Sequence, residues 1–241
     1  GKNSRAQLEN IANASERIAE LEAAEKEAIS VTSVAGKVLT DKRKTAASEL
    51  SKSVEIELAD LSMPGARFLV DFGDDVAGAG KEKFTDTGMD RVEFLIAPNP
   101  GEGLKPLVKI ASGGETSRLM LALKNVLAGV DYVPTLVFDE IDQGIGGRVG
   151  FIVGEKLWHL AVNHQVMCVT HLSQLAAFGE QHFRVRKQVV EDRTLTEVEA
   201  LDDTARIVEL AQMTGSMSDS NLNAAQEMLS QAHQRQRELK R

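Results

Sequence analysis

The chain has 241 residues and a mass of 26.2 kDa, long enough for one large domain or two small ones. Apolar residues make up 42% and charged residues 27%, which excludes a wholly disordered chain. The net charge of −8 argues against a surface that wraps nucleic acid throughout, and leaves room only for a local basic patch. No apolar run is long enough for a membrane span, and the single cysteine, Cys168, excludes an internal disulfide, which favours a reducing cytosol.

Residues 7–61 are predicted to be helical. They contain no proline and a single glycine, Gly36, among many Ala, Glu, Lys and Leu residues, so we expect one long helix or two helices joined near Gly36. A strict heptad that starts at Leu8 places four unsuited residues in its seam: Glu22, Glu25, Gly36 and Arg43. We therefore expect an imperfect coiled-coil arm over residues 1–62, which needs a partner helix to cover its apolar stripe.

Met63-Pro64-Gly65 ends the arm, and the remainder, residues 63–241, is predicted to be an α/β domain with parallel strands. Its central unit begins with a helix at Ser112 and continues with two apolar strands, Thr135–Asp139 and Val166–Thr170, which are expected to be buried and parallel. The other predicted elements are strands at 67–72 and 91–97, a helix at 148–162, a hairpin of 183–190 with 195–201, and helices at 205–213 and 222–239.

The first candidate site is the string Ala111–Glu115, directly before a helix. The residues Ser112, Gly113 and Gly114 would expose backbone N–H groups at the positive end of the helix dipole, which suits a phosphate. Ser112 and Glu115 are also spaced as a capping box, which needs no ligand. Both interpretations stay open, and they are compatible because capping turns the Glu115 carboxylate away from an anion.

The second candidate is the pair Asp139 and Glu140 at the end of an apolar strand. Ligands of open parallel sheets lie beyond the carboxyl ends of the strands, where these carboxylates would emerge. Asp139 could hold Mg²⁺ through its water shell, and Glu140 could orient or deprotonate an attacking water. The loop that follows has three glycines in four residues, which indicates a close backbone approach: Gly144, Gly146 and Gly147.

The third candidate is His171, just past the second apolar strand. A histidine there could merely satisfy local hydrogen bonds, but the two strands are expected to be parallel neighbours. Both strand ends should therefore open on one crevice, where His171 could reach a phosphate beside Glu140.

Two other kinds of site are not supported. Cys168, His171 and His182 lack zinc-like spacing, and Cys168 is expected in the core. The best candidate for a phosphate-binding loop, Gly78–Glu82, has Asp75 where the first glycine belongs and Glu82 where the hydroxyl belongs. The chain therefore holds one part of a nucleotide site and needs the rest from elsewhere.

Taken together, the motifs resemble those of ABC-type ATPases. Ser112–Glu115, Asp139-Glu140, Asp142–Gly147 and His171 look like the signature motif, Walker B, D-loop and switch histidine of that class. Longer strings are similar to the RecN family, SMC-related ATPases of bacterial DNA repair: Asn99-Pro100-Gly101, Lys105-Pro106-Leu107, Lys109-Ile110-Ala111, Phe138–Gly147 and Thr170–Ala176.

The resemblance implies the returning strand of a coiled-coil arm followed by the C-terminal lobe of an ABC-type head that uses ATP and Mg²⁺. Glu140 and His171 would be catalytic, Asp139 would hold Mg²⁺, and Asp142, Gly144 and Gly146 would form the D-loop. Ser112, Gly113, Gly114 and Glu115 would contact the nucleotide of a second head.

The implied partners are an N-terminal Walker A lobe, a second copy of the head and DNA, with no membrane. The expected place is the bacterial cytoplasm, at the nucleoid, in double-strand break repair. Two other functions stay open, a nucleotide-binding subunit of an ABC transporter and a non-catalytic coiled-coil adaptor.

Overall fold

The computed structural model describes residues 2–73, 84–110, 112–190 and 193–239, with no account of the side chains of residues 2–12 and 190. The chain divides into two compact units, Gly1–Glu49 with Leu69–Phe94 and Leu50–Phe68 with Leu95–Arg241. The long helix α1 and the strands β1 and β2 each contribute residues to both units. The expected boundary between arm and lobe at residue 62 is a different division and stays a prediction.

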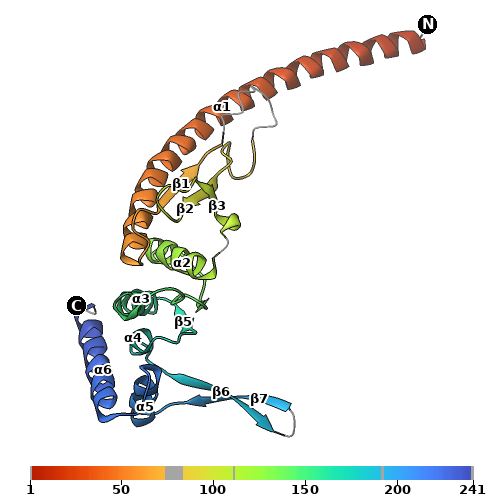
Figure 1. Cartoon of the computed structure of the whole chain (residues 1–241). Coiled ribbons are helices and arrows are strands. Elements are labelled where there is room, and N and C mark those ends of the chain that lie inside the picture. Colours follow the sequence, from red (N-terminus) through yellow and green to blue (C-terminus); the bar gives the residue numbers. More distant parts are fainter. Residues whose placement is uncertain (1, 74–83, 111, 191–192, 240–241) are drawn as a thin grey trace. The chain divides into compact units, whose positions relative to one another are not determined.

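Helix α1, Lys2–Asp60, is continuous and does not break at Gly36 (Figure 1). In the first unit Gly36 leaves room for the side chain of Met89, which fills the place where a β-carbon at position 36 would lie. About two turns further on, Arg43 Nη1 donates a hydrogen bond of 2.8 Å to Asp90 Oδ2. Gly36 and Arg43 therefore hold the segment around residues 87–90 on α1, which explains two of the residues that break the heptad.

Asp90 is the charged anchor of this contact. Burial alone would raise its pKa, but hydrogen bonds from Thr40 and Arg43 outweigh burial and hold the pKa of Asp90 below its usual value. Arg43 Nη2 also donates to the carbonyl oxygen of Thr87 at 2.7 Å. The contact is consequently a network of hydrogen bonds and a salt bridge around an ionised carboxylate.

The second unit begins with the last turns of α1, where Val54 and Leu58 are fully buried, as is Leu61 just after the helix. The helix ends at Asp60, and Ser62 with φ 65° and Gly65 with φ 82° turn the chain into the first sheet. That sheet has the order β1-β2-β3 and consists of Arg67–Asp71, Glu93–Ala97 and Lys105–Pro106. The first two strands confirm the strands expected at 67–72 and 91–97.

The central unit has the predicted order of helix, strand, helix and strand. Helix α2 spans Gly113–Leu127, strand β4 spans Thr135–Phe138, helix α3 spans Gly147–Leu160 and strand β5 spans Gln165–Cys168. Strands β4 and β5 pair in parallel, with Leu136 opposite Val166 and Phe138 opposite Cys168. The α/β prediction with parallel strands after a long helix is therefore confirmed.

One expectation about these strands is wrong, because they are not buried on both faces. Leu136 and Phe138 point into the core, but Val137, Met167 and Val169 are 66%, 54% and 61% exposed. Alternate residues of a strand point to opposite faces, so one face of the β4–β5 pair is apolar and is not covered by the part of the chain that the structure describes. Cys168, expected in the core, is only partly buried.

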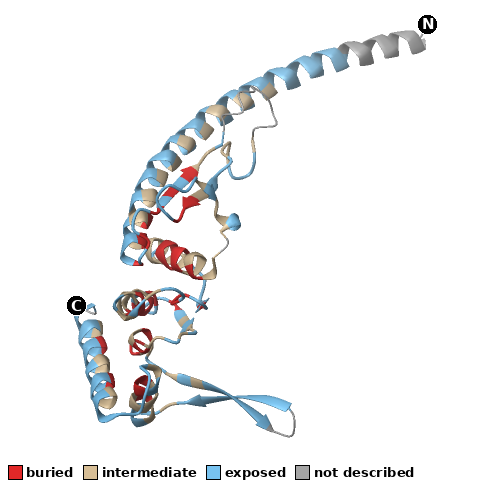
Figure 2. Ribbon diagram, viewed as in Figure 1, coloured by how far each residue is buried: buried red, intermediate tan, exposed pale blue. Residues whose placement is uncertain are grey.

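The C-terminal part packs around a small core of its own. Helices α4 (Ser173–Ala176), α5 (Asp203–Met213) and α6 (Asp219–Leu239) contribute to a cluster that includes Trp158, Phe178 and Leu210. The predicted hairpin is present as β6 (Phe183–Val190) and β7 (Arg193–Ala200), and nearly all of its described side chains are exposed (Figure 2). Glu191 and Asp192, at its predicted turn, lie outside the described residues.

Candidate functional site

Helix α2 begins at the predicted serine. Ser112 has extended backbone angles, and its hydroxyl accepts a hydrogen bond from the backbone N–H of Glu115 at 3.4 Å. Thr116 donates its hydroxyl to the Ser112 carbonyl oxygen at 2.8 Å. The first half of the capping box is thus formed, and it fixes the direction in which the helix leaves the loop. Ala111, which opens the predicted string, lies outside the described residues.

The loop after β4 is held in an unusual backbone conformation. Glu140 has φ 56°, a left-handed value that is uncommon for a residue with a side chain. Its backbone N–H donates to Asp139 Oδ1 at 2.8 Å, and its carbonyl oxygen accepts from the backbone N–H of Gln143 at 3.0 Å. A left-handed residue at the end of a strand is a mark of functional loops, because the surrounding contacts must hold it in place.

The start of α2 and this loop lie against each other within the same chain. The Glu140 carboxylate fills the place where a β-carbon at Gly113 would lie. The backbone N–H of Gly114 donates to Gln143 Oε1 at 3.3 Å, and a β-carbon at Gly114 would lie 3.0 Å from Gln143 Cβ. Gly113 and Gly114 therefore allow the close approach of the loop that carries Glu140, since a side chain at either position would displace part of that loop.

At the end of β5, His171 is held by a buried carboxylate. Asp142 is 3% exposed and accepts hydrogen bonds from the Thr170 hydroxyl and from the backbone N–H of His171, the latter at 2.9 Å. His171 Nδ1 lies 3.1 Å from Asp142 Oδ2, while the side chain of His171 is 72% exposed. Asp142 thus fixes the backbone and one ring nitrogen of His171 and leaves the other nitrogen free for a ligand.

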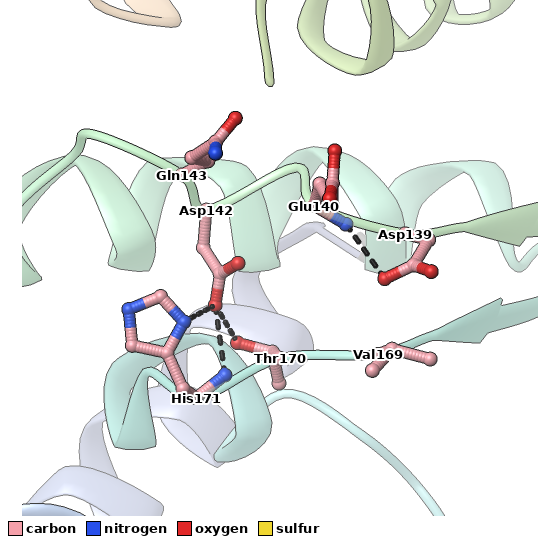
Figure 3. Close-up of a pocket in the computed structure, with 7 residues that line it drawn as sticks. All are labelled: Asp139, Glu140, Asp142, Gln143, Val169, Thr170 and His171. Atoms are coloured by element: carbon pink, nitrogen blue, oxygen red, sulfur yellow. Dashed lines mark hydrogen bonds and ion pairs between the residues drawn. The ribbon is translucent and has the colours of Figure 1, made fainter. Parts of the chain in front are cut away.

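The two strand ends open on one pocket, as expected from the parallel pairing. This open pocket of about 290 Å³ is lined by Asp139, Glu140, Asp142, Gln143, Val169, Thr170 and His171 (Figure 3). Figure 3 also shows that the side chains of Glu140 and Gln143 point away from His171. The catalytic candidates share a pocket, but in this structure they do not point at the same spot.

Ser112 and Glu115 line a different pocket, of about 240 Å³. Its other lining residues come from β2, β3 and the segments around β3 that precede α2, and include Asn99, Glu102, Lys105 and Lys109. The predicted phosphate-binding string and the predicted catalytic carboxylate therefore face separate spaces.

The residues fit Mg²⁺ only as a partial site. Asp139 and Glu140 are both exposed, and one Asp139 oxygen already accepts the Glu140 N–H. Among the described residues no group of three or more His, Cys, Asp and Glu side chains could hold a metal ion, zinc included. Since Mg²⁺ is commonly bound by one or two carboxylates together with phosphate oxygens and water, Asp139 fits as one such ligand.

The glycines of the 144–147 loop differ in their backbone angles and in which described atoms lie near them. Gly144 needs its glycine because φ is 75°, and Gly147 lies against the side chain of Gln174. Gly146 precedes α3 with extended angles, and no described atom lies near the positions where β-carbons at Gly144 and Gly146 would be. Within the described part of this chain, only Gly147 shows the close approach that the three glycines predicted.

Sequence reasoning missed several residues that hold the site: Asp142 as the partner of His171, and Ser117, Arg118, Gln143 and Thr170. Arg118 is 7% exposed, and burial lowers its pKa below the usual value. The charge of the nearby Glu115 acts in the opposite direction but does not outweigh burial. A signal was present in the sequence, because an arginine amid the apolar residues of an amphipathic helix requires buried acceptors.

No family model matches the chain. The sequence is nevertheless similar to curated bacterial proteins, each named DNA repair protein RecN. It is 39% identical to that of Halalkalibacterium halodurans over 216 residues, which cover 90% of this chain and 38% of the relative. The RecN proteins of Xylella fastidiosa and Bacillus subtilis are 44% and 36% identical, over 75% and 80% of this chain and 32% and 35% of theirs.

These matches confirm the predicted resemblance to the RecN family of bacterial DNA-repair proteins. The similarity to RecN extends over most of this chain. The chain spans about a third of the length of these relatives.

Solved structures of SMC head domains are weaker matches. The head of Pyrococcus yayanosii Smc with its coiled coil and joint is 20% identical, with a TM-score of 0.46, over 72% of this chain and 30% of that one. The head of Pyrococcus furiosus Smc bound to ScpA is 18% identical, with a TM-score of 0.45, over 71% and 39%. The relationship to RecN rests on the sequence similarity alone.

Proposed function

We propose that this chain is part of the ATP-binding and ATP-hydrolysing head of an SMC-like protein that acts in DNA double-strand break repair and recombination. The observation that carries the proposal is the pocket at the ends of the parallel strands β4 and β5, with Asp139, Glu140 and His171 in its lining. The names of the RecN relatives supply the setting of DNA repair.

In this proposal Glu140 is the catalytic carboxylate. Its exposed carboxylate orients the attacking water and accepts a proton from it. His171, held through Nδ1 by Asp142, uses its other ring nitrogen to contact the γ-phosphate. Asp139 would hold Mg²⁺ through the ion's water shell, and the ion would neutralise charge on the phosphates.

Ser112, Gly113, Gly114 and Glu115 are proposed to serve the nucleotide of a second head. Two observations support this, the separate pocket that Ser112 lines and the presence of Lys105 and Lys109 in its lining. A serine hydroxyl, the positive end of a helix dipole and two lysines suit a phosphate. ATP would thereby join two copies of the head, with Asp142, Gly144 and Gly146 in the loop between their sites.

The nucleotide's other phosphates require a partner lobe with a Walker A loop, which we propose is the N-terminal lobe of the same protein. The uncovered apolar face of β4 and β5 supports this, since parallel sheets are normally covered on both faces. The string Gly78–Glu82, which fails as a phosphate loop in sequence, lies outside the described residues.

The arm is proposed to be the returning strand of a coiled coil, with DNA bound by the arm or the head and the protein located at the bacterial nucleoid. Exposed apolar residues on α1, among them Leu21, Val31 and Val38, support the need for a partner helix. No described helix is long and apolar enough to cross a membrane. The transporter subunit and the adaptor remain the competing functions.

The test is to compare this chain alone with the full-length protein and with the chain mixed with its N-terminal lobe. We expect poor ATP binding and no steady hydrolysis by the chain alone, and hydrolysis once the Walker A lobe is present. The adaptor alternative predicts no hydrolysis by the chain alone, by the full-length protein or by the mixture with the N-terminal lobe. A transporter subunit would need a membrane partner to function. Steady turnover by the pure 241-residue chain would contradict the proposal of a divided site.

A further inference from the structure

Arg118 is a buried charge on the second turn of α2. Its side chain is 7% exposed, and its Nη1 donates to the carbonyl oxygen of Gln143 at 2.9 Å and more weakly to that of Ile141 at 3.5 Å. A buried guanidinium needs acceptors, because leaving it unpaired costs far more than a lost surface hydrogen bond. Arg118 and the backbone of residues 141–143 therefore hold each other in place.

Ser117, the neighbouring residue on α2, holds the other end of the same loop. Its hydroxyl donates to the carbonyl oxygen of Asp139 at 2.7 Å. Ser117 and Arg118 thus grip the loop on both sides of Glu140, the residue with the left-handed backbone. A backbone conformation of this kind costs of the order of 1–3 kcal/mol and persists only where such contacts impose it.

The first turn of α2 lies against the same loop. Gly113 adjoins the Glu140 carboxylate, and the Gly114 N–H donates to Gln143 Oε1. A shift or rotation of α2 that moves Ser112–Glu115 must therefore also move the contacts that place Glu140. The helix start and the carboxylate form one mechanical unit, although Ser112 and Glu140 line different pockets.

We infer that Ser117 and Arg118 are positioning residues that fix the direction of the Glu140 carboxylate and couple it to whatever binds at Ser112–Glu115. The inference rests on the proposed function, since it assigns these residues a part in ATP hydrolysis. Ser117 and Arg118 act through the backbone of residues 139–143 and touch no nucleotide themselves. Engagement of a second head at the start of α2 is thereby transmitted to the catalytic carboxylate.

The experiment uses the full-length protein and the variant Arg118→Lys, which keeps the positive charge but not the planar guanidinium group. We expect kcat for ATP to fall at least tenfold with KM unchanged within about twofold. Hydrogen exchange at the backbone amide of Gln143 should become faster. The control is Arg206→Lys, because Arg206 is equally buried and donates to the carbonyl oxygens of Ala176, Ala177 and Gly179, away from this loop.

A double-mutant cycle separates positioning from general destabilisation. If Arg118 acts through Glu140, Arg118→Lys should lower kcat in the wild-type background and have little effect on the residual rate of Glu140→Gln. Equal effects in both backgrounds, or equal losses of kcat in Arg118→Lys and Arg206→Lys, would overturn the inference. If Arg118→Lys does not fold, Ser117→Ala takes its place, with an expected loss of about threefold and the same dependence on Glu140.

The outcomes also distinguish this inference from the proposed function. Absence of ATP hydrolysis by the wild-type protein, or full activity of Glu140→Gln, would overturn both. Loss of activity in Glu140→Gln together with wild-type kcat in Arg118→Lys, or in Ser117→Ala where that variant takes its place, would overturn the positioning role alone.

Discussion

The ends of the two parallel strands differ in how they hold their functional candidates. After β4, Glu140 lies in a left-handed turn whose backbone is gripped from α2 by Ser117 and Arg118. After β5, His171 is 72% exposed, and among the described residues the ion-pair contact to its ring comes from the buried Asp142. One candidate is positioned through a network of backbone contacts and the other through a single carboxylate.

This difference predicts which substitutions should affect ATP hydrolysis most strongly. A side chain held by a network that includes a helix is sensitive to movements of that helix, whereas an exposed ring held by one partner can adjust on its own. We therefore expect the largest effects at Glu140, intermediate effects at the start of α2 and smaller effects at Asp142.

The largest expected effect is that of Glu140→Gln in the full-length protein. The amide keeps the shape but cannot accept the proton of the attacking water, so turnover should fall by about 10² to 10⁴-fold while ATP binding persists. Steady-state hydrolysis and equilibrium binding of labelled ATP check this, and ATP-bound dimers should accumulate in sedimentation. Wild-type turnover in this variant would remove Glu140 from the mechanism.

The next change, Ser112→Arg, acts on the start of α2. Loss of the cap should cost only about 1 kcal/mol of stability, so the fold should survive. A long side chain in the pocket that Ser112 lines should block the approach of another head's phosphate and stop ATP-dependent dimerisation. Analytical ultracentrifugation with ATP in the Glu140→Gln background measures this, and normal dimers would contradict the role assigned to Ser112.

A smaller effect is expected for Asp142→Asn. The neutral amide holds the ring of His171 less firmly, so kcat should fall about tenfold, the lower end of the effects seen for groups that orient a functional histidine. His171→Ala should cost at least as much, and the double variant no more than His171→Ala alone. Additive losses would show that Asp142 acts independently of His171.

Much of the fold could be predicted from local patterns. The absence of proline predicted the long helix, and the two apolar runs with a helix between them predicted the parallel pair β4–β5. Gly36 was ambiguous because its reason lies more than fifty residues away, in Met89, and helix propensity contains no such information. The exposure of Val137, Met167 and Val169 was missed because apolar strands do not reveal whether their cover belongs to the same chain.

For the candidate site, the sequence predicted that Glu140 and His171 would share a pocket, but it did not predict the residues that hold them or the directions of their side chains. Parallel pairing places Glu140 and His171 at one edge, which is a consequence of topology alone. The direction of the Glu140 carboxylate depends on φ at Glu140 and on tertiary contacts from Ser117 and Arg118. No pattern of residue types encodes a single left-handed residue that carries a side chain.

The smallest expected effect concerns Cys168, because the pKa of its thiol depends on carboxylates near the end of β4. Burial, then the charge of Asp142 and then that of Asp139 raise the pKa of Cys168 to about 12. At pH 7.5 roughly 3 in 100,000 of the molecules would carry the thiolate, against roughly a tenth for an ordinary thiol of pKa about 8.5. Alkylation by iodoacetamide should therefore be slow in the folded protein, and its rate should keep rising about tenfold per pH unit from pH 8 to 11.

Two variants test the contributions of the carboxylates to this pKa. Since Asp142 contributes more than Asp139, Asp142→Asn should speed the reaction more than Asp139→Asn. The urea-unfolded chain serves as the control and gives the rate of an ordinary thiol. A rate that levels off near pH 9 in the folded protein would show that neither burial nor the two carboxylates raise the pKa of Cys168.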